Sequence, residues 1–123
     1  MNSSRHEGIM QVLKTLQREN AGIEAAALVS PDGLILESML PPGVGEERIS
    51  AMSAALLAIA EKAAQESRRG RVRELYISGD EGYVVLLNVG VKAILTVIAS
   101  EKARLGYILL DSRKAAEEIE VLL

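Results

Sequence analysis

Cysteine, phenylalanine and tryptophan are absent from this sequence of 123 residues, and histidine occurs only once. Without cysteine there is neither a disulfide framework nor a thiolate nucleophile, which agrees with a reducing, cytoplasmic setting. The single histidine, His6, lies near the start of the chain and cannot supply a Ser-His-Asp or Cys-His arrangement. The sequence therefore predicts no catalytic residues and no enzyme activity.

Sites for metals and cofactors are also poorly represented. The aspartates are Asp32 and Asp80, both in predicted turns, and Asp111 in a predicted helix. Aspartate in a turn ordinarily binds the local backbone. The segment Gly43–Gly45 precedes a helix, but it lacks the third glycine and the Lys-Ser/Thr end of a phosphate-binding loop. We expect no metal and no cofactor.

Charge and hydropathy exclude two classes of partner. The net charge of −3 gives no general reason to expect nucleic acid. The first eight residues lack the apolar region of a signal peptide, and no uncharged run is long enough to span a bilayer. The sequence predicts a cytoplasmic protein without membrane insertion.

Hydrophobic periodicity and turn residues divide the chain into eight elements. A helical repeat begins the chain, and Ser30–Gly33 has the residues of a hairpin turn. We predict helices over Ser4–Asn20, Glu46–Ser67 and Lys102–Leu122, and strands over Ile23–Ser30, Leu34–Met39, Arg71–Ser78, Tyr83–Val89 and Ala93–Ser100. The last two strands are apolar on both faces and are expected at the centre, with Arg71–Ser78 at an edge. The predicted fold is α+β, in the order α-β-β-α-β-β-β-α, with a five-stranded antiparallel sheet that carries one helix on one face and two on the other.

The second predicted helix has an unusual run, ISAMSAALLAIA, with no charge between Ile49 and Ala60. Helical spacing gives one stripe of Ile49, Met52, Leu56, Ile59, Ala60 and Ala63, and places Ser50, Ala51, Ala54, Leu57 and Ala58 largely opposite. A helix that is apolar nearly all round needs cover on both sides. A second copy of the chain, or another protein, is the expected cover, although alanine also occurs for its helix propensity alone.

The basic cluster over residues 68–73 is the strongest charge feature, and two interpretations stay open. Arginines at a helix end complement the helix dipole in a solvated position. They also form a patch for an acidic partner surface, and an arginine acting in trans on a GTPase is a further hypothesis.

Three segments carry a family resemblance: LVSPDGLILES, GDEGYVVLLNVGVKAILTVIA and ARLGYILLDSRKAAEEIEVLL. With the order of elements, they resemble the Roadblock/light-chain-seven family over nearly the whole chain. The resemblance implies one profilin-like domain over residues 1–123. It also implies a homodimer whose third strands pair across a two-fold axis while the second helices pack together.

Function and sites follow from the resemblance as expectations. It implies a non-catalytic regulator or scaffold that binds a small Ras-like GTPase in signalling. The alternatives are an adaptor subunit of a larger assembly, as in dynein light chains, and a small-ligand sensor. The expected dimer interface is Ala51, Ala54, Leu57, Ala58, Val72, Glu74, Leu75, Tyr76 and Ile77. The expected partner surface is Ser50, Glu61, Gln65, Arg68, Arg69, Arg71 and Arg73.

Overall fold

The order of helices and strands in the computed structural model, which describes residues 2–123 and side chains from residue 4 onward, is the predicted one. The helices are α1 (Asn2–Glu19), α2 (Glu46–Glu66) and α3 (Leu105–Leu122). The strands are β1 (Ile23–Val29), β2 (Ile35–Met39), β3 (Glu74–Gly79), β4 (Gly82–Val89) and β5 (Ala93–Ser100). Helix α3 begins later than predicted, because Lys102 and Ala103 form a turn whose N–H groups bond to Ser100.

All five strands form one antiparallel sheet in the order β2-β1-β5-β4-β3. The apolar strands β4 and β5 lie inside the sheet, and β3 forms one edge, as predicted. Strand β2 forms the other edge. Each edge strand has hydrogen-bonding groups along one side that no strand within residues 2–123 pairs.

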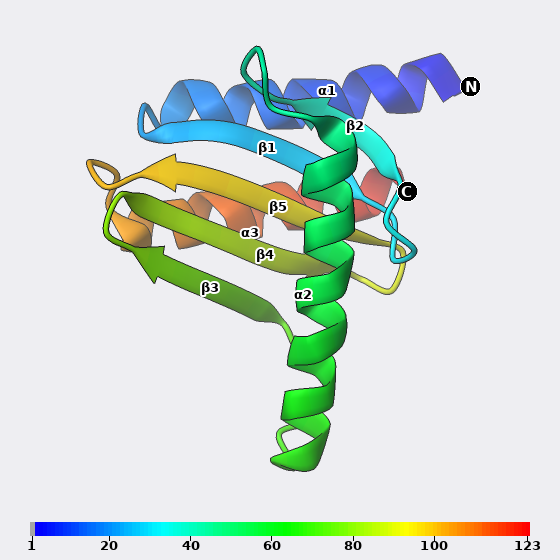
Figure 1. The fold of residues 1–123 in the computed structure, drawn as a ribbon. Helices are drawn as coiled ribbons and strands as arrows, with labels where there is room; N and C mark the ends of the chain where they lie inside the picture. Colours follow the sequence, from blue (N-terminus) through cyan, green and yellow to red (C-terminus); the bar gives the residue numbers. More distant parts are fainter. Residues whose placement is uncertain (1) are drawn as a thin grey trace.

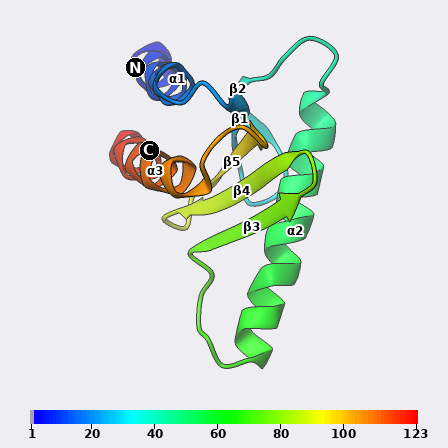
Figure 2. The ribbon, with the colours of Figure 1, turned by 90° about the vertical axis from the view of Figure 1, so that its left-hand side faces the viewer.

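The helices cover the two faces of the sheet unequally. Helices α1 and α3 lie side by side on one face, and α2 lies alone on the other (Figures 1 and 2). The predicted distribution of two helices and one helix is therefore confirmed.

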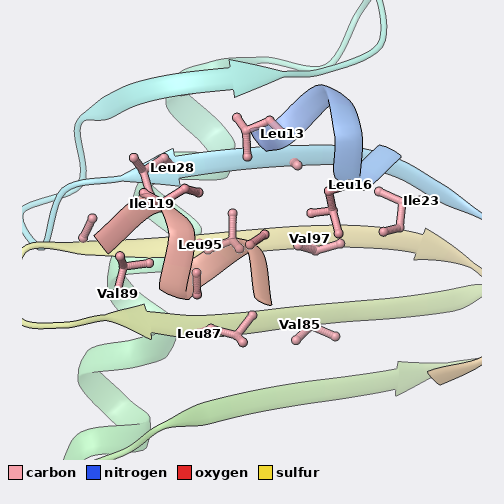
Figure 3. Packing of buried hydrophobic residues seen from close by; sticks show 14 of the residues in the cluster. Leu13, Leu16, Ile23, Leu28, Val85, Leu87, Val89, Leu95, Val97 and Ile119 are labelled. Atoms are coloured by element: carbon pink, nitrogen blue, oxygen red, sulfur yellow. The ribbon is translucent and has the colours of Figure 1, made fainter. Parts of the chain in front are cut away.

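The larger core lies between the sheet and the pair α1 and α3 (Figure 3). Side chains from both helices and from β1, β4 and β5 meet there, and many of them are fully buried: Leu13, Leu28, Val85, Leu95, Val97, Ile108 and Ile119. A smaller core lies under α2 and contains Ala27, Val29, Ile49, Leu57, Leu86 and Ile94. Because aliphatic residues fill both cores, neither needs phenylalanine or tryptophan.

Two turns at one end of the sheet border α2. The first joins β1 to β2, where Gly33 has a φ of 91° and its N–H donates to the Ser30 carbonyl at 3.0 Å. This left-handed conformation favours glycine. The second turn, over residues 90–92, joins β4 to β5. Both turns lie at the same end because β1 and β4 each run antiparallel to β5.

Helix α2 crosses the strands near this end and continues beyond the β3 edge (Figure 1). Its 21 residues correspond to about 31 Å at 1.5 Å per residue. It packs mainly on β1, β2 and β5, so its last turns lie past the sheet that supports its beginning. None of the described helices has the length and apolar character needed to cross a bilayer.

Candidate functional site

Within the described residues 2–123, no three His, Cys, Asp or Glu side chains lie together as metal ligands. His6 Nδ1 lies 2.6 Å from Glu37 Oε2, and Glu37 is buried on β2 beneath α1. The features that set this molecule apart are surfaces, and they lie around β3 and α2.

The edge strand β3 pairs with β4 from Glu74 to Gly79 and leaves its other side free within the chain. Its side chains alternate between the two faces of the sheet. Tyr76 is 48% exposed on the α3 face, and Ile77 is 42% exposed on the α2 face. An edge strand with exposed apolar side chains is a natural template for another strand.

A row of apolar side chains on the α2 face runs inward from this edge. The strand register places Ile77 opposite Val84, and Val84 opposite Ile98. All three keep part of their surface exposed, whereas Leu86 and Thr96 in the neighbouring row are buried. Helix α2 therefore covers one row of the sheet and leaves the next one open, as the uncovered ends of β3, β4 and β5 in Figure 1 show.

The orientation of α2 differs from the predicted one. Ile59, expected on the buried stripe, is 68% exposed, whereas Ser50 and Leu57, expected opposite, are buried. Small side chains explain the difference. Ser53 faces the sheet and forms a buried 2.7 Å hydrogen bond with Thr96, so the helix approaches β5 on its serine face.

This rotation gives α2 two distinct flanks. One flank, with Ala54, Ala58 and Glu61, borders the turns that contain Pro31 and Val91. The opposite flank, by helical geometry, carries Met52, Leu56 and Ile59 and faces the open row of the sheet. Of the α2 residues expected at a dimer interface, Ala51 and Ala58 are exposed, Ala54 is half-buried, and Leu57 is unavailable because it belongs to the smaller core.

A polar clasp joins α2 to the segment before β3. Glu61 Oε1 accepts a hydrogen bond from the Val72 N–H at 2.9 Å, and Glu61 Oε2 accepts one from Asn88 Nδ2 at 3.2 Å. Asn88 Nδ2 also donates to the Val72 carbonyl at 2.8 Å. Because these side chains satisfy the Val72 backbone, β3 begins at Glu74 and not at Arg71 as predicted.

The clasp also changes the predicted partner surface. Glu61 is committed to internal hydrogen bonds, and Ser50 is buried with its hydroxyl donating to the Glu47 carbonyl at 3.1 Å. Ser50 is therefore not available at the surface, whereas the half-buried Glu61 still borders the surface with its carboxylate committed to the clasp. The remaining predicted members are exposed: Gln65, Arg68, Arg69, Arg71 and Arg73.

The backbone at the end of α2 is unusual. Arg68 has a φ of 59°, and within residues 2–123 no other residue besides glycine has a positive φ. A left-handed residue is common just after a helix, but glycine is the usual choice because a side chain is strained there. The N–H groups of Ser67, Arg68 and Arg69 bond back to carbonyls of α2, which holds this conformation.

Glu74 anchors the start of β3 to α3. Its carboxylate accepts two hydrogen bonds from the Arg113 guanidinium. These bonds lower the pKa of Glu74 from its ordinary value, although partial burial opposes them. Glu74 was predicted at the dimer interface, and its charge is already neutralised within the chain. Tyr76 and Ile77 are the exposed members of that prediction on β3, with Val72 and Leu75 half-buried.

Sequence reasoning missed five members of the apolar surface: Met52, Leu56, Ile59, Val84 and Ile98. The three helix residues were assigned to the buried stripe of the helix, and Val84 and Ile98 to strands covered on both faces. The exposed row follows from the position of α2 across the sheet, and no local sequence pattern reports that position.

Comparisons with known proteins identify the family of this fold. The Roadblock/LC7 domain profile matches residues 9–99. A relative named uncharacterized protein MJ1340, from Methanocaldococcus jannaschii, is 34% identical over 101 residues, which cover 82% of this chain and 88% of that protein.

Solved structures agree in fold. A structure described as MglB with tetrameric arrangement superposes with a TM-score of 0.89 at 22% identity, covering 96% of this chain and 89% of the other. Profilin II from Acanthamoeba castellanii superposes with a TM-score of 0.65 at 21% identity, covering 89% and 94%. The profilin-like expectation is confirmed, and the chain belongs to the Roadblock/LC7 domain family.

Proposed function

We propose that the chain forms a homodimer in the cytoplasm that binds a small Ras-like GTPase and regulates or scaffolds it without chemistry of its own. The dimer would join two β3 edges across a two-fold axis. The GTPase would then bind the paired α2 helices and the basic loop over residues 68–73.

One observation carries the dimer: an unpaired edge strand lies beside an apolar row that its own chain leaves open. If two β3 strands paired antiparallel, each α2 would extend over the neighbouring sheet, because it already continues past β3. The second helix would cover Ile77, Val84 and Ile98 of the first chain. Met52, Leu56 and Ile59 would then line the contact between the helices.

A symmetric contact of this kind is supported by its geometry. A two-fold interface uses the same patch on both copies, so each copy must offer both the surface and its cover. Here the open row of the sheet lacks a covering helix, and the last turns of α2 lack a sheet to pack against. One chain supplies both parts of the contact, which favours a second copy over an unrelated protein as the cover.

The GTPase as partner rests on family membership together with the charge of the loop. Arg68, Arg69, Arg71 and Arg73 are exposed at the far end of α2. A regulator must bind one nucleotide state of the GTPase more tightly than the other, since equal affinity shifts nothing. The dimer would provide two copies of the basic loop for this contact.

Light scattering on the full chain tests the dimer. We expect twice the mass of 13.2 kDa for the natural sequence at micromolar concentration. Ile77→Asp and Ile59→Asp should each give a folded monomer, because a carboxylate would be buried in the contact. Val121→Asp is the matched control, since Val121 is 86% exposed on α3, away from β3. A natural chain that stays monomeric would refute the dimer.

Capture from native lysate tests the partner. The immobilised chain should retain a small GTPase more strongly with one of GTP and GDP than with the other. Ile77→Asp should reduce this retention if the dimer is the binding form. Equal retention with both nucleotides would leave a scaffold and rule out regulation, whereas no GTPase in either eluate would contradict the partner.

A further inference from the structure

A hollow lies on the flank of α2 that the proposed dimer leaves free. It has a volume of about 210 Å³ and lies between α2 and the two turns at the end of the sheet. All of its walls come from one chain. Ala54, Leu57 and Ala58 form the helix side, and Pro31 and Val91 form the turn side. We call it the turn groove.

The walls of the turn groove are apolar, and the polar groups at one of its ends form hydrogen bonds within the chain. Ile94 adds to the apolar lining, and Val91 on the rim is 68% exposed. Glu61 and Asn88 also reach the groove, but their hydrogen bonds to each other and to Val72 occupy them. The clasp thus closes one end of the groove without leaving a buried polar group unmet.

One charged group on the lining is available for contact. Arg71 is exposed, and among the side chains described from residue 4 onward its guanidinium forms no ion pair. Arg69, two residues earlier in the chain, is also exposed. Because the Glu61 carboxylate is hydrogen-bonded within the chain, the accessible charge on the lining of the groove is positive, although the whole chain has a net charge of −3.

The size of the groove discriminates between occupants. Small-molecule sites commonly measure roughly 300–1,000 Å³, so a groove of about 210 Å³ suits a single large apolar side chain better. An apolar anchor surrounded by complementary charge is the usual composition of a protein contact. Arginine also prefers carboxylate partners, which it binds with two parallel hydrogen bonds.

We propose that the turn groove docks a segment of a partner protein that places one apolar side chain, such as leucine, beside carboxylates. The apolar side chain enters between Ala58 and Val91, and a carboxylate pairs with Arg71. The inference rests on the proposed function for the identity of the partner, the GTPase. The groove itself is complete in one chain, so it does not depend on the dimer.

Titration of the ¹⁵N-labelled full chain with synthetic peptides tests the docking. The probes are two capped heptapeptides with a central leucine, one flanked by aspartate and glutamate and the other by lysine. The acidic peptide should shift the amide signals of Ala58, Val91 and their neighbours. The lysine peptide should bind on the order of tenfold more weakly, because like charges meet at the groove.

Three variants sharpen the test. Val91→Asp should abolish the shifts. The control Val121→Asp, which is the same substitution at another exposed valine, should keep them. Arg71→Glu should reverse the preference between the two peptides. Equal binding of both peptides, shifts outside the groove or absence of shifts would each overturn the proposal. Failure of the dimer or of GTPase capture would not produce these results, since the peptides read a surface within one chain.

Discussion

The two faces of the sheet differ in how completely the chain covers them. On the face of α1 and α3, Leu13, Ile108 and Ile119 are fully buried. On the face of α2, Ile77 and Ile59 remain 42% and 68% exposed. Burial of apolar surface is the main favourable term in folding. The first face therefore stabilises the fold, and the second offers apolar surface that only another molecule can bury.

The same difference explains why the exposed flank of α2 is apolar but carries mostly small side chains. Alanine at positions 51 and 55 exposes little apolar area and allows close approach, while Ile59 supplies one larger apolar side chain. A surface of this kind tolerates water while the chain is alone and packs well against a second helix. The face covered by α1 and α3 is buried within the single chain, and its side chains are the larger Leu, Ile and Val.

The largest expected effect contrasts one isoleucine from each face. Ile108→Ala on the closed face should lower the free energy of unfolding by ~2–5 kcal/mol, because it leaves a cavity in the core. Urea denaturation should show this loss at every protein concentration. Ile59→Ala on the open face should have an effect only at concentrations where the chain dimerises. A concentration-independent loss from Ile59→Ala would show that this side chain serves the single chain.

An intermediate effect is expected from the clasp, which ties the open face together. Glu61→Ala removes the acceptors of the Val72 N–H and of the Asn88 amide, at an expected cost of ~1–3 kcal/mol. Hydrogen exchange should show faster opening of Val72 and of the β3 amides, with β5 unchanged. Glu61→Gln keeps an acceptor for Val72 and should lose less. Equally faster hydrogen exchange across the whole sheet would show that the clasp does not act locally on β3.

The smallest expected effect concerns the ion pair between Glu74 and Arg113, which links β3 to the closed face. Because the pair lowers the pKa of Glu74 below its ordinary 4.5, its stabilisation is complete above that pH. The stabilisation is lost as the pH falls through the lowered value. Arg113→Met should therefore reduce stability slightly at neutral pH and less in acid. Urea denaturation at both pH values, with Lys114→Met as control, measures the difference.

Much of the fold could be predicted because its signals are local. The helical repeat of Ile9, Leu13 and Leu16 marks α1, and the residues of Ser30–Gly33 suit the observed hairpin turn. The doubly apolar strands β4 and β5 were expected at the centre of the sheet, and they lie there. Each of these features depends on residues within a few positions of one another, so the sequence reports them directly.

The exposed apolar surface was harder to predict, because it depends on the rotation of α2 about its axis and on contacts between residues far apart in the sequence. Between Ile49 and Ala60 no charged residue marks the wet side of α2, so nothing in the pattern fixes the face that meets the sheet. The buried bond between Ser53 and Thr96 joins residues 43 positions apart, and it coincides with the observed rotation. Glu61 and Asn88 are 27 positions apart, and their clasp decides where β3 begins.

The second edge of the sheet, β2, has a consequence for how far copies can assemble. It is a short strand of 5 residues, and its register shifts where it pairs with Leu28 and Val29. Glu37 points inward from it toward α1, where it is 7% exposed. Irregular register and inward carboxylates discourage a strand from joining an edge.

A subunit with two adhesive edges adds copies without limit and grows into a fibre, whereas a subunit with one stops at a closed pair. We therefore expect the inward carboxylate of Glu37 to disfavour the pairing of another chain with the β2 edge. Glu37→Val should accordingly favour assemblies larger than the closed pair.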